Sequence, residues 1–318
     1  MTAPAGGPGP SASEVPPAGT VSPLAGTATI GFVGLGNMGE PMVRRLATAG
    51  YEVRAYDIAE QARARLTGTA RVTVTESPAD VADGADVVIL MLPGSDVVEQ
   101  VLLADGLLDR VRPRTLVADM SSSEPSRTKA LAEQAADRGV TLVDAPVSGG
   151  VVGARAGSLT IMTGGPADAL AIIGPVLSVL GRRVVHAGDI PGAGHAIKAL
   201  NNLMSAAHLL ASSEAMLAGQ AFGLDPAVML DIVNTSSGRS GSTENKWPNY
   251  ILPGTFDSGF SISFMVKDMR IALQLADAAG TPAPLSRAAV AAWTSADAQL
   301  PAGSDHTEIA RWLRQAPR

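Results

Sequence analysis

Short apolar runs alternate with amphipathic stretches along the first two thirds of the chain. An apolar run between turn residues is typical of a strand buried on both faces, and apolar side chains every three to four positions are typical of a helix. Their alternation predicts an α/β fold with a doubly wound, mostly parallel sheet of the Rossmann type. The runs that we interpret as strands are residues 30–33, 52–56, 86–92, 115–118, 141–143, 159–163 and 183–186.

Several helix boundaries can be predicted from capping residues. Ser77 precedes Pro78, as an N-cap precedes a first-turn proline. Ser123 is predicted to cap a helix that runs to about Arg138, and a further helix is expected over residues 166–180.

The pattern changes near Gly192, after which no strand is predicted. One long helical pattern covers residues 196–222 and ends at Gly223, and Asp225 then caps a new helix that begins with Pro226. The Pro, Gly, Ala and Ser of the first 28 residues cannot build a core. We therefore expect a disordered tail over residues 1–28, an α/β domain over residues 29–191, and an all-α domain over residues 192–318.

Composition excludes several classes of function. The 318 residues are 46% hydrophobic and 17% charged, with a net charge of −6, which argues against a nucleic-acid-binding surface. The absence of cysteine excludes disulfides, thiolate zinc sites and a cysteine nucleophile. No apolar run is long enough to span a membrane, and the four histidines lack metal-ligand spacing, so we expect neither a membrane anchor nor a metal. The start of the chain lacks the pattern of a secretory signal, and we expect a cytoplasmic protein.

The turn after the first strand has the sequence Gly34-Leu35-Gly36-Asn37-Met38-Gly39. In a strand–turn–helix context, the first glycine makes the tight turn, the second leaves room for a pyrophosphate, and the third lets the helix pack closely on the strand. The helix N-terminus would then offer free N–H groups to the phosphates. A plain glycine-rich surface turn is the alternative, but the helix and the second strand that follow in register favour a dinucleotide site.

Asp57 ends the second strand, about 20 residues beyond the glycines. A carboxylate at this place accepts hydrogen bonds from ribose hydroxyls and repels a 2′-phosphate, and the next residue is Ile58 rather than an arginine. We therefore predict NAD as the cofactor, with NADP as the less favoured one. A solvated aspartate without a ligand is the alternative.

Lysine is rare in this chain, where arginine supplies most cations. The four lysines are Lys129, Lys198, Lys246 and Lys267. A position that keeps lysine can need an amine that loses its proton, which arginine does not do. Lys198 is the only formal charge between Asp189 and Glu214, which favours a buried amine with a lowered pKa, suited to proton transfer. Asn202 shares its helix face. A helix lysine that snorkels to solvent is the alternative.

Three further positions could bind a ligand. The turn 148–150, Ser-Gly-Gly, offers a hydroxyl and successive N–H groups to an anion such as a carboxylate, although an ordinary glycine turn is equally consistent with it. Lys267 could contact the cofactor, but a solvated pair with Asp268 is the default. Arg239, on a loop, is a candidate clamp for a carboxylate.

Together these segments resemble the β-hydroxyacid dehydrogenase family, which includes 3-hydroxyisobutyrate dehydrogenase and tartronate semialdehyde reductase. The resemblance extends from about residue 30 to the C-terminus. The matching segments are GLGNMG at 34–39, DMSS at 119–122, DAPVSGG at 144–150, GAGHAIKALNN at 192–202, and KDMRIAL from Lys267. Ser122 stands where many relatives carry threonine, and the hydroxyl is retained.

The resemblance implies roles for individual residues. Lys198 would be the general acid/base, Asn202 would orient the substrate, and Ser148 and Gly149 would hold its carboxylate. The cofactor would be surrounded by Leu92, Pro93, Ser122 and Lys267 in addition to the glycine turn. The resemblance also implies that residues 29–191 form a dinucleotide-binding Rossmann domain and that the all-α domain, residues 192–318, holds the substrate and forms the oligomer. A homodimer or homotetramer is implied as well.

These observations predict an NAD-dependent dehydrogenase of a small 3-hydroxy acid or its semialdehyde. One alternative is a non-catalytic cofactor-binding homologue, and another is an imine reductase-like enzyme. Relatives of both kinds lack the catalytic lysine, so Lys198 disfavours each of them. The identity of the substrate cannot be predicted from the sequence.

Overall fold

The computed structural model describes Leu24 and residues 28–315, which form two compact units with their boundary between Ile197 and Lys198. The predicted tail lies outside the described residues apart from Leu24 and Ala28. Leu24 donates a backbone hydrogen bond to the Ile172 carbonyl at 3.1 Å. No helix in the described part of the chain is long and apolar enough to cross a lipid bilayer.

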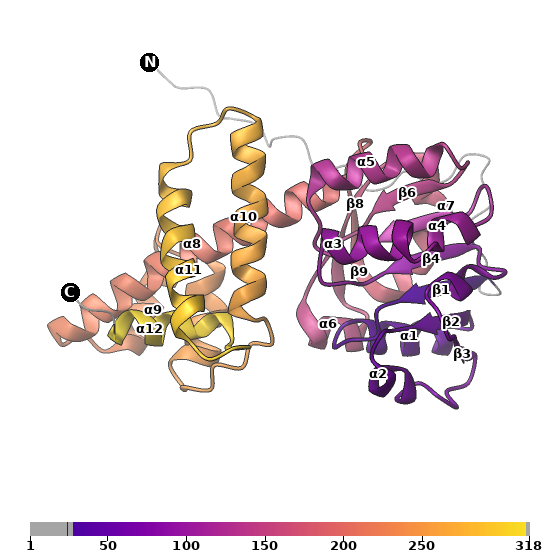
Figure 1. The fold of residues 1–318 in the computed structure, drawn as a ribbon. Coiled ribbons are helices and arrows are strands. Elements are labelled where there is room, and N and C mark those ends of the chain that lie inside the picture. The colour runs from indigo at the N-terminus through magenta and orange to yellow at the C-terminus, as the bar shows by residue number, and fades with distance from the viewer. Residues whose placement is uncertain (1–23, 25–27, 316–318) are drawn as a thin grey trace, which may run out of the picture. The chain divides into compact units, whose positions relative to one another are not determined.

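A mostly parallel sheet forms the centre of the first unit, as predicted (Figure 1). Its strands are β1 (Thr29–Val33), β2 (Glu52–Tyr56), β3 (Val72–Val74), β4 (Val87–Leu90), β5 (Leu116–Asp119), β6 (Thr141–Asp144), β7 (Val147–Ser148), β8 (Leu159–Gly164) and β9 (Gly181–Gly188). They follow the order β3-β2-β1-β4-β5-β6-β8-β7, and β9 pairs with β8. The pairings of β8 with β6 and with β7 are antiparallel. Because β1, β2, β4 and β5 are parallel, their carboxyl ends share one edge of the sheet.

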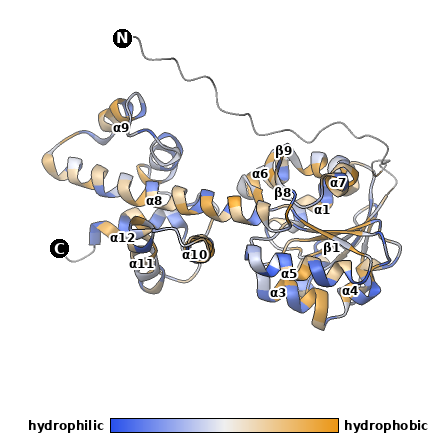
Figure 2. Cartoon of the chain, turned by 90° about the horizontal axis from the view of Figure 1, so that it is seen from above, coloured by the Kyte–Doolittle hydropathy of each residue, from blue (hydrophilic) through white to orange (hydrophobic). Residues whose placement is uncertain are grey.

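Helices cover both faces of this sheet. They are α1 (Gly39–Thr48), α2 (Glu60–Ala64), η1 (Ala79–Ala82), α3 (Ser95–Glu99), η2 (Gln100–Ala104), α4 (Leu107–Arg110), α5 (Pro125–Ala136), α6 (Gly150–Ala156) and α7 (Ala167–Leu180). Figure 2 shows α1, α6 and α7 on one side of the strands and α3, α4 and α5 on the other. Since successive strand residues face opposite ways, Phe32 packs into the first apolar layer and Val33 into the second.

Two of the predicted helix starts are wrong in detail. Ser123 does not cap α5, because its hydroxyl donates to the buried Asp119 carboxylate at 2.7 Å and Glu124 takes the N-cap position. Pro78 is itself the N-cap of η1, one position earlier in the helix than predicted, although the Ser77 hydroxyl does accept a hydrogen bond from the Asp80 N–H.

The second unit is helical. Helix α8 (Ala193–Phe222) begins in the first unit and continues into this one, followed by α9 (Pro226–Asn234), η3 (Ser242–Ile251), α10 (Ile262–Ala278), α11 (Pro284–Gln299), η4 (His306–Glu308) and α12 (Ile309–Gln315). Asp225 caps α9 as predicted, by accepting from two backbone N–H groups. Trp247 and Trp293, both fully buried, contribute to an apolar core shared by α8, η3, α10 and α11.

Candidate active site

The glycine turn between β1 and α1 has the geometry that a bound pyrophosphate requires. Gly34 has a φ of 102°, and a Cβ atom there would collide with the Met91 carbonyl. A Cβ atom on Gly39 would collide with the carbonyl of Gly34. By contrast, a Cβ atom on Gly36 would meet nothing within 4 Å. The fold therefore needs glycine at two of these positions, whereas the open space beside Gly36 fits the approach of a phosphate group.

Asp57 is tied to this turn. Its carboxylate accepts a hydrogen bond from the Leu35 N–H at 2.6 Å and one from the Ala59 N–H at 2.8 Å. The Arg63 guanidinium donates to the Asp57 carbonyl at 2.7 Å. The side chain of Asp57 is half-buried, so part of the carboxylate faces solvent beside the turn, where a ribose would lie. The remaining turn residues, Asn37 and Met38, precede the first turn of α1.

The loops that follow β4 and β5 are joined to each other. The Leu92 N–H donates to the Ser121 hydroxyl at 2.9 Å, and the Ser121 N–H donates to the Asp119 carboxylate at 2.9 Å. These bonds hold the half-buried Leu92 and Ser122, and the exposed Pro93, at the sheet edge that also carries the glycine turn. The cofactor candidates of the first unit thus follow the carboxyl ends of four neighbouring strands.

Asp144 and His195 have structural roles that the sequence did not reveal. The buried Asp144 carboxylate accepts hydrogen bonds from the Gly192 N–H at 2.6 Å and the His195 N–H at 2.8 Å, and so caps the start of α8. His195 Nε2 donates to the Ser121 carbonyl at 3.1 Å. The sequence places an aspartate at the end of a strand and a histidine in the first turn of a long helix. Their spacing gives no indication that the two residues are in contact.

Ser148 ends β7, and Gly149 follows it as the N-cap of α6. Gly149 has a φ of 129° and Gly150 a φ of 59°, conformations that favour glycine. Ser148 is half-buried and both glycines are exposed, so a ligand can reach the hydroxyl and the adjacent N–H groups.

Lys198 is buried, with 8% of its surface exposed, which confirms the predicted burial. Loss of solvation lowers the pKa of its amine below the usual value. The Asp268 carboxylate acts in the opposite direction and raises this pKa, while the Lys267 cation lowers it further. The amine is therefore easier to deprotonate than that of a surface lysine.

Asn202 and Asp268 form the polar surroundings of Lys198. Asn202 Nδ2 donates to Asp268 Oδ2 at 2.6 Å, and both residues are buried. Lys267 Nζ lies 2.9 Å from Asp268 Oδ1. The second unit thus brings together Lys198 and Asn202 from α8 with Lys267 and Asp268 from α10. Asn202 and Asp268, which share a hydrogen bond, are 66 positions apart in the sequence. Asp268 is the member whose role the sequence did not indicate.

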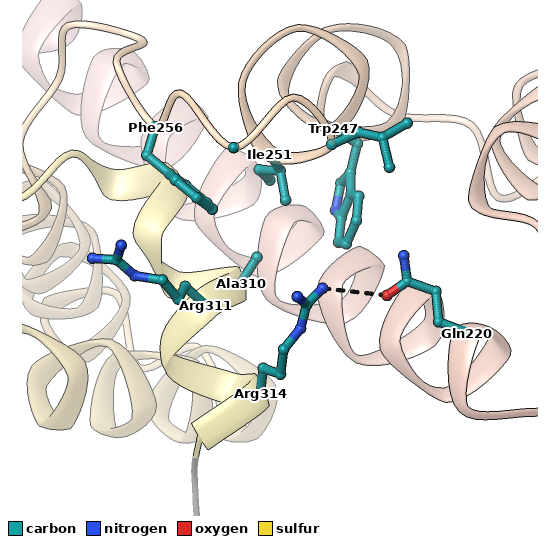
Figure 3. A pocket seen from close by; sticks show the side chains of 9 residues that line it. Gln220, Trp247, Ile251, Phe256, Ala310, Arg311 and Arg314 are labelled. Carbon is teal, nitrogen blue, oxygen red and sulfur yellow. Dashed lines mark hydrogen bonds between the residues drawn. The ribbon is translucent and has the colours of Figure 1, made fainter.

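Arg239 lies apart from these contacts. Its side chain is 62% exposed and pairs with Glu244 at 2.8 Å. A hollow of about 350 Å³ in the second unit is lined by Trp247, Phe256, Arg311 and Arg314 among others (Figure 3). Arg314 donates to Gln220 at 3.3 Å, and none of the predicted site residues lines this hollow. Among the described residues, no group of three His, Asp or Glu side chains is arranged to hold a metal ion.

Two family models match the chain, one over each part of it. A family model described as the NAD binding domain of 6-phosphogluconate dehydrogenase matches residues 29–188. A second, described as the NAD-binding of NADP-dependent 3-hydroxyisobutyrate dehydrogenase, matches residues 192–313.

Individual relatives match over most of their length. The chain is 39% identical to 2-(hydroxymethyl)glutarate dehydrogenase of Eubacterium barkeri, over 81% of this chain and 85% of the relative. It is 40% identical to 3-hydroxyisobutyrate dehydrogenase of Pseudomonas aeruginosa, over 80% and 88%. The solved structure of Mycobacterium tuberculosis 3-hydroxyisobutyrate dehydrogenase with L-serine superposes with a TM-score of 0.85 at 33% identity, covering 91% of this chain and 99% of that one. The chain therefore belongs to the 3-hydroxyisobutyrate dehydrogenase-like family of β-hydroxyacid dehydrogenases and is an NAD(P)-dependent 3-hydroxyacid dehydrogenase.

Proposed function

We propose that this enzyme interconverts a small 3-hydroxy acid and its semialdehyde, with Lys198 as the general acid/base. The observation that carries the proposal is the buried amine of Lys198, whose pKa is lowered by burial. In oxidation, the neutral amine accepts the proton of the substrate hydroxyl as the hydride leaves the same carbon. In reduction, the ammonium returns the proton to the oxygen. The nicotinamide, when bound, supplies or accepts the hydride.

The other residues bind and orient. Ser148 and Gly149 would hold the substrate carboxylate through a hydroxyl and a backbone N–H, which suits an anion. The side chain of Asn202, already fixed by Asp268, would orient the substrate hydroxyl toward Lys198. Residues 34–39 with Leu92, Pro93, Ser122 and Lys267 would hold the cofactor.

NAD is the preferred cofactor in this proposal. The Asp57 carboxylate favours ribose hydroxyls and repels a 2′-phosphate. Arg63 is engaged with the carbonyl groups of Asp57 and Ile58, and Arg65 pairs with Glu40, so neither cation is free to bind a phosphate. Comparing kcat/KM with the two coenzymes tests the preference, and a clear advantage for NADP would contradict it.

The substrate class follows from what the relatives are named for. 2-(Hydroxymethyl)glutarate, 3-hydroxyisobutyrate and L-serine, for which three relatives are named, all carry a primary alcohol whose carbon is bonded to the carbon that bears the carboxylate. We propose a substrate of the form HOCH2–CH(R)–COO⁻, in which only R differs. An imine reductase or a non-catalytic homologue is disfavoured because Lys198 and Asn202 are both retained.

The proposed assembly is a homodimer or homotetramer in the cytoplasm. Several apolar side chains of the second unit are exposed, including Phe222 at 84% and Ile232 at 58%. Exposed apolar groups of this size favour a second copy of the chain as their cover. Light scattering measures the mass of the protein in solution, and the mass of a monomer would contradict this proposal.

Replacing Lys198 with Ala tests the proton-transfer role. We expect turnover to fall by about 10²- to 10⁴-fold because the general acid/base is lost, with NAD affinity unchanged in a calorimetric titration. Lys129→Ala removes an exposed lysine of α5 and is the matched control. If Lys198→Ala kept turnover near that of the control, the assigned role would be wrong.

A further inference from the structure

Lys246 is a second lysine of the helical unit whose amine is largely removed from solvent. It lies on η3, where its Nζ donates a hydrogen bond to the Ser205 hydroxyl at 2.8 Å. Within the described residues, no carboxylate oxygen comes within the 4.0 Å of an ion pair with this amine. The neighbouring Trp247 is only 1% exposed, so the backbone of η3 is fixed at this point.

Ser205 places this amine beside the catalytic face of α8. Lys198, Asn202 and Ser205 are spaced by four and three positions, so they share one face of the helix. Seven residues of helix rise about 10 Å. The Lys246 amine is therefore held about two helical turns beyond Lys198, on the face where the substrate hydroxyl would be bound.

The acidic group that acts on Lys246, Asp305, does not neutralise it. The Asp305 carboxylate raises the pKa of this amine, but it already accepts hydrogen bonds from the Ser258 hydroxyl and from Thr307. It also accepts from the N–H groups of Gly259 and Phe260. Burial prevails and lowers the pKa of Lys246 to about 8. A partly buried ammonium with one neutral hydrogen-bond acceptor leaves two donors for an added anion.

We propose that Lys246 binds an anionic group on the R substituent of the substrate, so that the enzyme prefers a 3-hydroxy diacid to a monoacid. This inference rests on the proposed function, since it assumes that the hydroxyl is bound at Lys198. The carboxylate on R would pair with the Lys246 ammonium. Ser205 acts as a positioning residue, because its hydroxyl fixes the lysine side chain. The ordinary alternative is a structural lysine that only covers apolar surface.

Two substrates that differ only in R distinguish an anion-binding Lys246 from a purely structural one. 2-(Hydroxymethyl)glutarate carries a second carboxylate on R, whereas R in 3-hydroxyisobutyrate is a methyl group. We expect the wild-type enzyme to favour the diacid in kcat/KM. In Lys246→Met, which keeps an unbranched apolar side chain without the charge, the ratio of diacid to monoacid kcat/KM should fall by about 10- to 100-fold, because a hydrogen bond to a charged group is lost. The loss should appear in KM rather than in kcat, since R does not react.

Two further variants complete the design. Lys246→Arg keeps the charge and should retain most of the preference for the diacid. Lys129→Met, at an exposed position, should leave the ratio unchanged. An equal loss on both substrates in Lys246→Met, or a wild-type enzyme that favours the monoacid, would overturn the inference while the dehydrogenase function stood.

If no hydroxy acid were turned over, the proposed function would be wrong, but the role of Lys246 could still be tested by ligand binding. Glutarate and butyrate are the probes, added to the NAD-loaded protein in a thermal-shift titration. Glutarate should bind more tightly than butyrate to the wild type and lose this advantage in Lys246→Met. If the two acids bound alike, or if neither bound, the inference would be wrong.

Discussion

The pKa of one amine decides the chemistry at the scale of single residues. Lys198 loses solvation by burial, which favours the neutral amine, and faces the Asp268 carboxylate, which favours the ammonium. Oxidation needs the neutral form as proton acceptor and reduction needs the charged form. Burial therefore makes the neutral form easier to reach, while the Asp268 charge keeps the ammonium form accessible for the reverse reaction.

Asp268→Asn should shift the pH dependence of oxidation. The rate rises with pH as Lys198 loses its proton, and removing the Asp268 charge lowers the pKa further. We therefore expect the rising limb of kcat/KM against pH to move to lower pH. Asp277→Asn, on the exposed side of the same helix, is the control and should leave the limb in place. A shift to higher pH would show that Asp268 does not act on Lys198 by its charge.

The sequence predicted part of this site and missed another part for a clear reason. Lys198 and Asn202 could be identified because they are four residues apart on one helix. Asp268 could not be paired with them, since the contact depends on how α10 packs against α8. Local spacing carries no information about such a contact.

The long helix α8 illustrates what is decided at the scale of elements. Its length could be predicted because the helical periodicity continues past Gly219 and ends only at Gly223. The strands β3 and β7 were not predicted, because each has only two or three residues and depends on its neighbours for pairing. The π-helical turn η3 was not predicted either, as its hydrogen-bond pattern leaves no distinct spacing in the sequence.

The start of α8 depends on Asp144. Replacement with Ala removes the acceptor of two buried N–H groups, those of Gly192 and His195. We expect the free energy of unfolding to fall by about 3 kcal/mol or more, since buried donors would be left without a partner. Urea denaturation measures the change.

A second cap offers the comparison. Asp225→Asn at the exposed start of α9 should change the unfolding free energy by no more than a few tenths of a kcal/mol, because asparagine caps helices as well as aspartate does. An Asp144→Ala variant as stable as this control would contradict the capping role.

Stability of the whole molecule should depend on the protonation of His306. Burial and the nearby Lys246 lower its pKa from 6.5 to about 4. The unfolded chain therefore binds a proton at a higher pH than the folded chain does. The contribution of neutral His306 to stability is fully present above about pH 6.5 and is lost as the pH falls toward 4.

The expected loss over this window is about 3 kcal/mol, at 1.36 kcal/mol per pKa unit. Urea denaturation at pH 7 and at pH 4.5 measures it, and His306→Gln should flatten the difference between the two. A wild-type protein equally stable at both pH values would show that His306 is protonated as readily in the folded state as in the unfolded chain.

The effect of the Asp268 charge on the buried Lys198 amine also limits how this enzyme can evolve. A mutation that replaced the lysine alone would remove a positive charge near the buried Asp268 carboxylate, whose contacts are with Asn202 and Lys267. A descendant that adopts a different chemistry would first pass through this less stable intermediate, or would change both positions together. The two residues should therefore behave as one inherited unit.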